Sequence, residues 1–271
     1  MIHGGVYMKK FIVLIAGLCL TVQAFATVGI LKSDEDFIYS NYFKIRVDPR
    51  AQTIDLLNFE NIEETFPLPV EPYKRDVHFG GWLRDDSPDS CLNTRAKVLV
   101  RDSVTPVTFT ADKCTVQTGK WDDPYTARPH LKAGDIQIDH VVALKNAYMT
   151  GAHEWNFAKR CLYGNYMGNK FHLLSVNGPE NLKKSDHSPR DYVPPNKKFV
   201  CEFVKTWLNI KLIWSLRITP KEGEAIQNIV QSNHCNQADF VVSMQSLNEQ
   251  QRFMTDHADL CASVGQQLQS F

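Results

Sequence analysis

A short segment near the middle of the chain has the sequence Ile136-Gln137-Ile138-Asp139-His140-Val141-Val142. Its run of alternating and β-branched apolar residues is typical of a β-strand, and the following residues 143–149 favour a helix. Because successive side chains of a strand point to opposite faces, we expect Ile136, Ile138 and His140 on one face and Asp139 on the other. The segment therefore predicts a strand that carries two ionisable side chains at its end.

A second strand and a helix are expected further along the chain. The strand is predicted by Phe171-His172-Leu173-Leu174-Ser175-Val176, and the start of the helix by Asn177-Gly178-Pro179-Glu180. In such a start Asn caps the first turn, Pro is tolerated there, and Glu reaches back to the cap. Asn181 then lies in the first or second turn. A strand–strand–helix unit of this kind allows Asp139, His140 and Asn181 to converge.

At these residues the chain resembles the HNH endonucleases, also called His-Me finger or ββα-metal nucleases. Within them it is similar to a branch of exported bacterial proteins with a DUF1524-type domain. The resemblance covers residues 73–200 and rests on Asp139-His140-Val141-Val142-Ala143-Leu144, Gly151-Ala152, Trp155, Asn169, Leu173-Leu174-Ser175, Asn181, Lys184-Ser185-Asp186 and Pro189. Upstream it includes Cys91-Leu92-Asn93-Thr94-Arg95, Val98-Leu99-Val100-Arg101-Asp102, Cys114 and Gly119-Lys120-Trp121-Asp122-Asp123-Pro124-Tyr125.

The resemblance implies a role for each residue of the strand–strand–helix unit. His140 would be the catalytic general base, since an imidazole that is neutral can take a proton from water. Asp139 and Asn181 would be the metal ligands, because their oxygens suit one divalent ion, expected to be Mg²⁺. Supporting or phosphate-contacting roles would fall to Asn169, His172, Lys184 and Arg95.

Two positions depart from the family pattern. Asn181 stands where the family name has its final His, a change that the family often allows. His172 stands where this branch would have Asn, so that it could pack, orient the site or touch the metal. We favour packing or orientation.

Composition and charge exclude several other classes of protein. The 271 residues are 43% hydrophobic and 22% charged, and the mean hydropathy is −0.30, which excludes disordered, fibrous and multi-span membrane proteins. Lys+Arg and Asp+Glu both number 30, so bulk charge does not indicate nucleic-acid binding. Residues 155–217, however, hold eleven basic and four acidic residues. This basic segment could follow a phosphate backbone without reading its sequence.

The N-terminus has the features of a cleaved secretory signal peptide. A basic start at Met8-Lys9-Lys10 precedes an apolar stretch over residues 11–22 and a small-residue cleavage signal at Ala24-Phe25-Ala26. We expect cleavage after Ala26 and a secreted or periplasmic protein without a membrane span.

Cysteine usage agrees with export. Beyond the leader the chain has an even set of cysteines, Cys91, Cys114, Cys161, Cys201, Cys235 and Cys261, which predicts up to three disulfides in an oxidising compartment. We favour sequential pairing, that is 91 with 114, 161 with 201 and 235 with 261, because each pair closes a local loop. Zinc binding is disfavoured, since no two cysteines have the close spacing of structural zinc sites.

The expected organisation is a signal peptide (1–26), an N-terminal segment with a Pro-rich linker (27–72), an HNH-like nuclease domain (73–217) and a helical C-terminal extension (218–271). Further short strands are predicted at 43–47, 97–101, 105–110 and 114–116. In the extension, Phe240, Val241, Met244 and Leu247 have helical spacing and predict a packing stripe.

The fold class expected is α+β, with a ββα-metal core, added short strands and disulfides. The expected function is a metal-dependent endonuclease that acts on DNA, or on RNA, with little sequence preference, since no separate base-reading module is evident. The alternative is an exported, disulfide-stabilised binding or scaffold protein with an inactive HNH-like fold.

Overall fold

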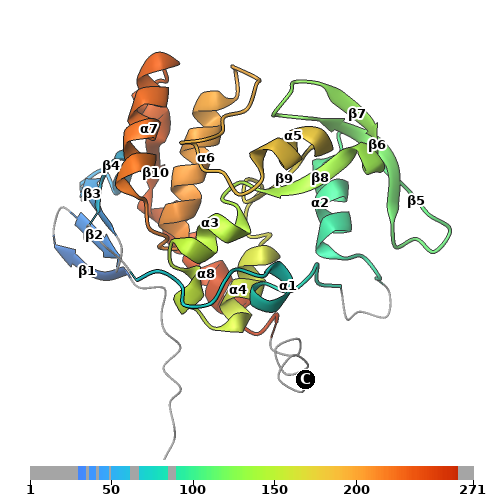
Figure 1. Cartoon of the computed structure of the whole chain (residues 1–271), viewed down its shortest axis with the longest axis horizontal. Coiled ribbons are helices and arrows are strands. Elements are labelled where there is room, and N and C mark those ends of the chain that lie inside the picture. Colours follow the sequence, from blue (N-terminus) through green and yellow to red (C-terminus); the bar gives the residue numbers. More distant parts are fainter. Residues whose placement is uncertain are drawn as a thin grey trace, which may run out of the picture.

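Antiparallel sheets and surrounding helices make up a mixed α+β fold (Figure 1). The structure, a computed structural model, describes residues 30–34, 37–40, 43–48, 50–61, 67–84 and 90–261. The predicted signal peptide 1–26 and the last ten residues, 262–271, lie outside the described residues.

The described strands form three sheets. A five-stranded sheet has the order β1-β2-β3-β4-β10, a three-stranded sheet the order β5-β6-β7, and β8 pairs with β9. The strands are β1 (Ile30–Asp34), β2 (Phe37–Ser40), β3 (Phe43–Asp48), β4 (Thr53–Asn61), β5 (Thr108–Phe109), β6 (Val116–Asp122), β7 (Pro129–Lys132), β8 (Ile136–His140), β9 (Leu173–Asn177) and β10 (Val241–Ser243).

The helices lie between and around these sheets (Figure 1). They are α1 (Arg75–His78), α2 (Thr94–Asp102), α3 (Leu144–Met149), α4 (Phe157–Gly164), α5 (Gly178–Lys184), α6 (Val200–Ile213), α7 (Pro220–Ser232) and α8 (Met244–Asp256). Short 3-10 turns occur at Ala133–Asp135, Ala152–Glu154 and Gln237–Phe240.

The two central strands and the helix after them form where the sequence predicts them. In the antiparallel pair β8 and β9, Asp139 lies opposite Leu174 and His140 opposite Leu173. Helix α5 starts directly after β9, and the Asn177 side chain accepts a hydrogen bond from the Glu180 amide as its N-cap. The Glu180 carboxylate does not reach back to the cap as expected. It accepts hydrogen bonds from Lys183 and Tyr192 instead.

The strand predicted at 97–101 is wrong, and those predicted at 105–110 and 114–116 are strand only at β5 (Thr108–Phe109) and at the first residue of β6 (Val116–Asp122). Residues 97–101 belong to helix α2, which the Asn93 side chain caps by accepting a hydrogen bond from the Ala96 amide. The helix buries Val98 and Leu99 against a second apolar cluster, and the Trp121 indole donates to the Leu99 carbonyl at 2.8 Å. Packing of one helical face thus overrides the strand preference of valine.

The C-terminal region departs from a continuous helix. Phe240 ends a 3-10 turn, Val241 begins β10, and only from Met244 does the chain continue as α8. Strand β10 pairs antiparallel with β4, with Val242 opposite Ile54. Phe240 and Leu247 are buried as expected, whereas Val241 is 44% exposed.

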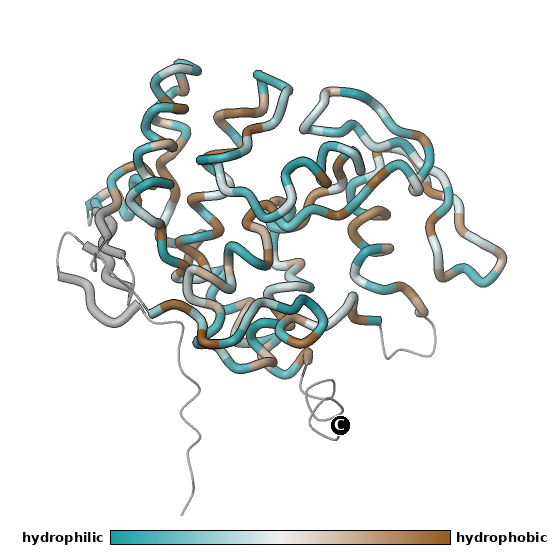
Figure 2. The backbone as a smooth tube through the Cα atoms, in the orientation of Figure 1, coloured by the Kyte–Doolittle hydropathy of each residue, from teal (hydrophilic) through white to brown (hydrophobic). Residues whose placement is uncertain are grey.

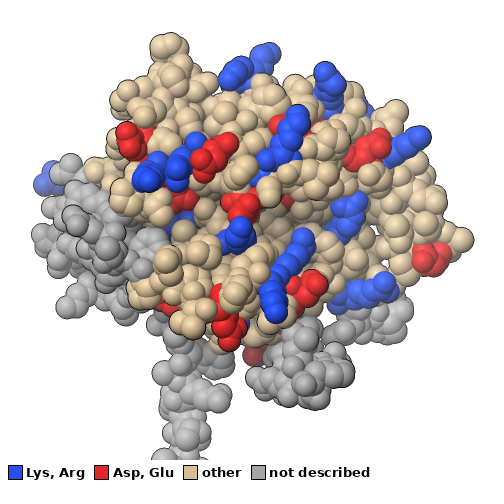
Figure 3. Space-filling view, in the orientation of Figure 1, with Lys and Arg blue, Asp and Glu red and all other residues tan. Residues whose placement is uncertain are grey.

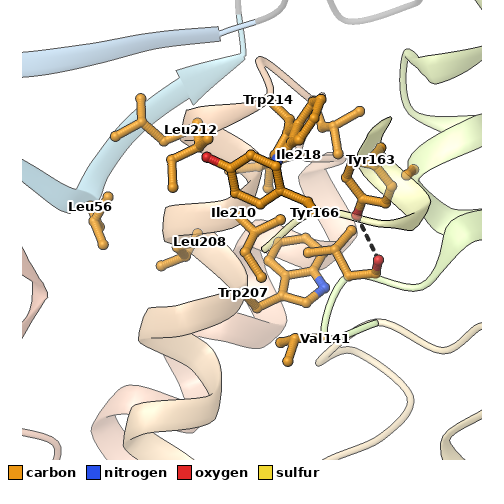
Figure 4. Close-up of a cluster of buried hydrophobic side chains, with 14 of the residues drawn as sticks. Leu56, Val141, Tyr163, Tyr166, Trp207, Leu208, Ile210, Leu212, Trp214 and Ile218 are labelled. Atoms are coloured by element: carbon orange, nitrogen blue, oxygen red, sulfur yellow. Dashed lines mark hydrogen bonds between the residues drawn. The ribbon is translucent and has the colours of Figure 1, made fainter. Parts of the chain in front are cut away.

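The main core surrounds helix α6. Figure 2 shows hydrophobic residues recurring along this helix, and the buried set includes Trp207, Leu208 and Trp214. Figure 4 shows Tyr163 beside this cluster, with its hydroxyl donating to the Val142 carbonyl at 2.6 Å. The core therefore reaches from α6 to the residues that directly follow β8.

Three disulfides join distant elements, and their pairing corrects the sequential prediction. Cys91 pairs with Cys114 as expected, but Cys161 pairs with Cys261 and Cys201 with Cys235. The cause is that α6 and α7 pack together, which brings Cys201 on α6 beside Cys235 after α7. Cys161 on α4 pairs instead with Cys261, in the chain that follows α8.

Candidate functional site

A surface pocket of about 440 Å³ opens where β8, α3, α5 and the segment around α1 meet. Three of the sequence-predicted residues, Asp139, His140 and Asn181, line it together. The other lining residues are Tyr73, Arg75, Gln137, Ile138, Ala143, Leu144, Lys145, Leu182, Ser185 and Asp186.

His140 is held by the end of helix α4. Its ring Nε2 lies 2.8 Å from the Gly164 carbonyl oxygen. Because a carbonyl oxygen only accepts hydrogen bonds, Nε2 must carry a hydrogen and donate it. In the neutral ring the lone pair is then on Nδ1, which is the nitrogen free to take up a proton.

Burial keeps this imidazole neutral. Burial first, and then the neighbouring His172, lower the pKa of His140 well below its usual value, while the Gly164 carbonyl opposes this shift. Trp82 lies parallel to the imidazole, with ring centroids 5.3 Å apart and an interplanar angle of 2°. The structure therefore presents an oriented and unprotonated histidine at the pocket.

Asp139 is buried and accepts two hydrogen bonds. The Lys184 ammonium lies 2.8 Å from its Oδ1, and the Tyr125 hydroxyl donates to its Oδ2 at 2.5 Å. Burial raises the pKa of Asp139, and Lys184 and Tyr125 oppose this by stabilising the ionised form. Lys184 also donates to the His140 carbonyl at 3.0 Å and is fully buried. It therefore supports the strand end from inside and does not lie on the surface.

Asn181 points from α5 toward β8. Its Nδ2 donates to the Gln137 side-chain oxygen at 2.9 Å. Its amide oxygen has no hydrogen bond within the described residues, and Gln137 lines the same pocket. The two predicted metal ligands, the Asp139 carboxylate and the Asn181 amide oxygen, thus belong to residues that line the same pocket.

The remaining sequence candidates lie outside the pocket lining. Asn169 accepts hydrogen bonds from the Phe171 and His172 amides, and its own amide donates to Gln250 on α8. Arg95 donates to the Ala133 and Ile136 carbonyls at the start of β8. Both residues therefore brace the loops and strands around the site.

His172 is packed behind the site. Its Nε2 lies 2.8 Å from the Tyr163 carbonyl, and its Nδ1 has no hydrogen-bond partner among the described residues. Burial lowers the pKa of His172 to about 3. Its ring lies edge-on or tilted against the rings of Tyr163, Tyr166 and Trp214. These aromatic contacts are those of a side chain that packs in the core.

The basic segment 155–217 places fewer positive charges on the protein surface than its sequence suggests. Lys184, Lys211 and Arg217 are buried, and Lys211 is used inside the protein to bind Asn146, Thr150 and the Arg217 carbonyl. Exposed members include Lys170, Lys183, Arg190, Lys197 and Lys198. Figure 3 shows Lys and Arg interspersed with Asp and Glu over the face that it displays.

Several residues around the site carried no sequence signal for a role. Tyr125 belongs to the turn after β6 and reaches Asp139, and Gly164 contributes only its backbone carbonyl. Trp82 and Arg75 come from a segment before the disulfide-linked Cys91. Their proximity to the pocket depends on tertiary packing, which no local pattern reports.

Comparison with known proteins gives two matches. Residues 98–229 match the family described as "GmrSD restriction endonucleases, C-terminal domain", a range that includes β8, β9 and α5 but not Arg75 or Trp82. An "Uncharacterized secreted protein" of Arthroderma benhamiae is 30% identical over 162 residues, covering 60% of this chain and 76% of the fungal protein. No solved structure gives a significant match.

The secreted relative and the three disulfides support an extracellular location. None of the helices in the described part of the chain has the length and apolar character that crossing a membrane requires. The chain therefore belongs to the same family as this secreted fungal protein, and its match at residues 98–229 relates it to nucleases.

Proposed function

We propose that the protein is a secreted or periplasmic endonuclease of the HNH type, which hydrolyses phosphodiester bonds of DNA, or of RNA, with little sequence preference. The observation that carries this proposal is the state of His140. Its Nε2 is fixed on the Gly164 carbonyl, its pKa is depressed by burial, and it lines a pocket with Asp139 and Asn181.

The proposed chemistry starts with a water molecule in the pocket. Nδ1 of His140 takes a proton from this water, and the resulting hydroxide attacks the phosphorus atom. The P–O bond to the leaving sugar oxygen breaks, and that oxygen takes up a proton from solvent water. The imidazolium formed in the first step is stabilised by the Gly164 carbonyl and by the face of the parallel Trp82 ring. Because the base is already oriented and neutral, it needs neither rotation nor deprotonation before it acts.

We propose that a single divalent ion, Mg²⁺, binds at this pocket; the Asp139 carboxylate that would hold it also accepts hydrogen bonds from Lys184 and Tyr125. Among the described residues no group of three or more His, Cys, Asp or Glu side chains could hold a metal. Mg²⁺, however, is commonly bound by one or two protein oxygens, with water and phosphate oxygens completing its shell. Asp139 and Asn181 would supply these oxygens, and the bound ion would stabilise negative charge on the phosphate.

Low sequence preference is supported by the kind of contacts available. Lys170, Lys197 and Lys198 are exposed. Lysine ammonium groups contact phosphates, which are the same at every position of the chain. Binding should accordingly weaken as salt is raised.

The test is cleavage of plasmid DNA and of a structured RNA by the purified protein with Mg²⁺, with chelator, and with the His140→Ala and Asn181→Ala variants. We expect cutting with Mg²⁺ that chelator abolishes and that both substitutions reduce by about a hundredfold or more. His187→Ala, at an exposed histidine, is the matched control and should cut like the unchanged protein.

Undiminished cutting by His140→Ala would remove the assignment of the base. Absence of cutting with every divalent ion tried, together with retained binding of nucleic acid, would favour the alternative, an exported binding or scaffold protein.

A further inference from the structure

We propose that Arg75 is the residue of this site that grips the phosphate group, and that Trp82 holds Arg75 in place beside His140. This inference rests on the proposed nuclease function and adds to it a substrate-binding residue outside the segment that matches the GmrSD domain.

Arg75 is placed where a substrate would bind. It is exposed, and it lines the pocket together with Asp139, His140 and Asn181. Its guanidinium carbon lies 5.4 Å from the centre of the Trp82 ring, within the range of a cation–π contact. The same ring is stacked on the His140 imidazole at 5.3 Å. One indole therefore fixes both the general base and a cation.

The short helix that carries Arg75 is anchored from below. His78, the last residue of α1, is buried, and its Nε2 lies 3.1 Å from the Tyr148 hydroxyl. Arg160 on α4 donates to the His78 carbonyl at 2.8 Å, and Phe79 is 1% exposed. The exposed guanidinium is thus attached to backbone that the core holds firmly.

The other cations near the pocket already have carboxylate partners. Lys145 lies 2.6 Å from Asp186, Lys183 lies 3.1 Å from Glu180, and Lys184 is buried against Asp139. Arg75 has no such partner among the residues that the structure describes, although it lines the same pocket. It therefore offers its charge and its planar set of donors to an incoming anion.

The geometry of a guanidinium fits a phosphate better than that of an ammonium. Its parallel N–H groups can donate to two phosphate oxygens at once, and such charge-assisted pairs are stronger than neutral hydrogen bonds. A phosphate held by Arg75 would also lie next to His140, where the attacking water must be activated. Arg75 would act on binding and on the charged transition state together.

The experiment compares Arg75→Gln and Arg75→Lys with Arg252→Gln, which changes an exposed arginine of α8 outside the pocket lining. Cleavage kinetics are measured on a fluorescent duplex, and binding is measured in chelator by fluorescence anisotropy over a range of salt concentrations. We expect Arg75→Gln to lower kcat/KM about tenfold or more and to reduce the salt slope of binding by about one. Arg75→Lys should recover part of the loss.

Trp82 is tested as a positioning residue by a second pair of variants. Trp82→Phe keeps a ring face for both neighbours and should retain most activity, whereas Trp82→Leu should lose at least as much as Arg75→Gln, since it also removes the ring stacked on His140. The double variant Trp82→Leu/Arg75→Gln should have a kcat/KM only slightly lower than that of Trp82→Leu alone, because each change removes the same contact between Trp82 and Arg75. Additive losses would show that the indole does not act through Arg75 and would overturn its part in the proposal.

The outcomes separate this inference from the proposed function. An unchanged protein that neither cuts nor binds nucleic acid would overturn both. A protein that cuts, with Arg75→Gln matching Arg252→Gln in kcat/KM and in salt slope, would overturn the assignment of Arg75 and leave the nuclease function standing.

Discussion

The Lys184 ammonium lies 2.8 Å from the Asp139 carboxylate, and both side chains are buried. This pair joins the third element of the ββα unit to the first, because Lys184 ends α5 and Asp139 lies near the end of β8. It therefore couples the stability of the fold to the position of the next residue in the chain, His140, which is the proposed general base.

Removal of one partner of this pair should cost more stability than removal of both. Lys184→Met leaves a buried carboxylate without its counter-charge and should lower the free energy of unfolding by about 3–5 kcal/mol. The double change Lys184→Met/Asp139→Asn should recover most of that loss. Urea unfolding of the two variants measures the difference, and equal losses would show that Asp139 does not depend on Lys184.

Stability should fall in mild acid because of the two buried histidines. His140 and His172 stay neutral in the folded protein, since burial depresses both pKa values, whereas the unfolded chain protonates them below about pH 6.5. Their contribution is complete above pH 6.5 and is lost as the pH falls, for His172 down to its pKa of about 3. Each histidine should cost about 1.4 kcal/mol per pH unit in this window.

Denaturant unfolding between pH 8 and pH 4 tests this slope. His172→Gln should reduce the slope of the unfolding free energy against pH by the contribution of one histidine, about 1.4 kcal/mol per pH unit. The exposed His187→Gln serves as control. A His172→Gln curve parallel to that of the unchanged protein would contradict the assignment.

Activity should persist to lower pH than an ordinary histidine base allows. The depressed pKa of His140 keeps its Nδ1 free of a proton below pH 6.5. We therefore expect the acid limb of kcat/KM to have its midpoint below 6.5, since kcat/KM reports ionisations of the free enzyme. A midpoint at or above 6.5 in a pH–rate profile would speak against a buried base.

The disulfides should contribute unequally to stability. The bond between Cys161 and Cys261 closes a separation of 100 residues, and that between Cys91 and Cys114 a separation of 23. On the loop-entropy argument, replacing each pair by Ser should cost about 5 and about 3 kcal/mol, respectively. Chemical unfolding of the two double variants compares them, and a larger cost for the Cys91–Cys114 pair would contradict this ranking.

The Cys161–Cys261 pair should also matter for activity. Cys161 lies one helical turn before Gly164, whose carbonyl holds His140. Loss of this disulfide should therefore lower cleavage more than loss of Cys91–Cys114, measured under conditions in which both variants remain folded.

The elements that carry the site could be predicted because their signals are local. The strand over residues 136–140 and the Asn177 cap depend on neighbours a few residues away, and both form as expected. The expected division of faces is not seen at the end of the strand, since Ile138, Asp139 and His140 all line one pocket. The same local reasoning placed Asp139, His140 and Asn181 within reach of one another, and the structure places all three in one pocket.

What could not be predicted depends on contacts between distant parts of the chain. Gly164 acts through its backbone, Tyr125 reaches Asp139 from the turn after β6, and Trp82 comes from outside the strand–strand–helix unit. The strand expected at 97–101 failed for a related reason, because burial of one face of α2 decides its conformation. The disulfide pairing likewise follows from how the helices pack, which spacing alone does not report.

Strand β10 completes a sheet whose neighbouring strand, β4, lies almost two hundred residues earlier, with Ser243 opposite Thr53. The sheet can gain its last strand only after the ribosome has synthesised all of the chain between β4 and β10. Contacts of such long separation slow folding, because the loop must close before the contact is gained. We therefore expect β4 to wait as an unpaired edge until late in folding, which makes it the place where a folding chaperone, or aggregation, would act first.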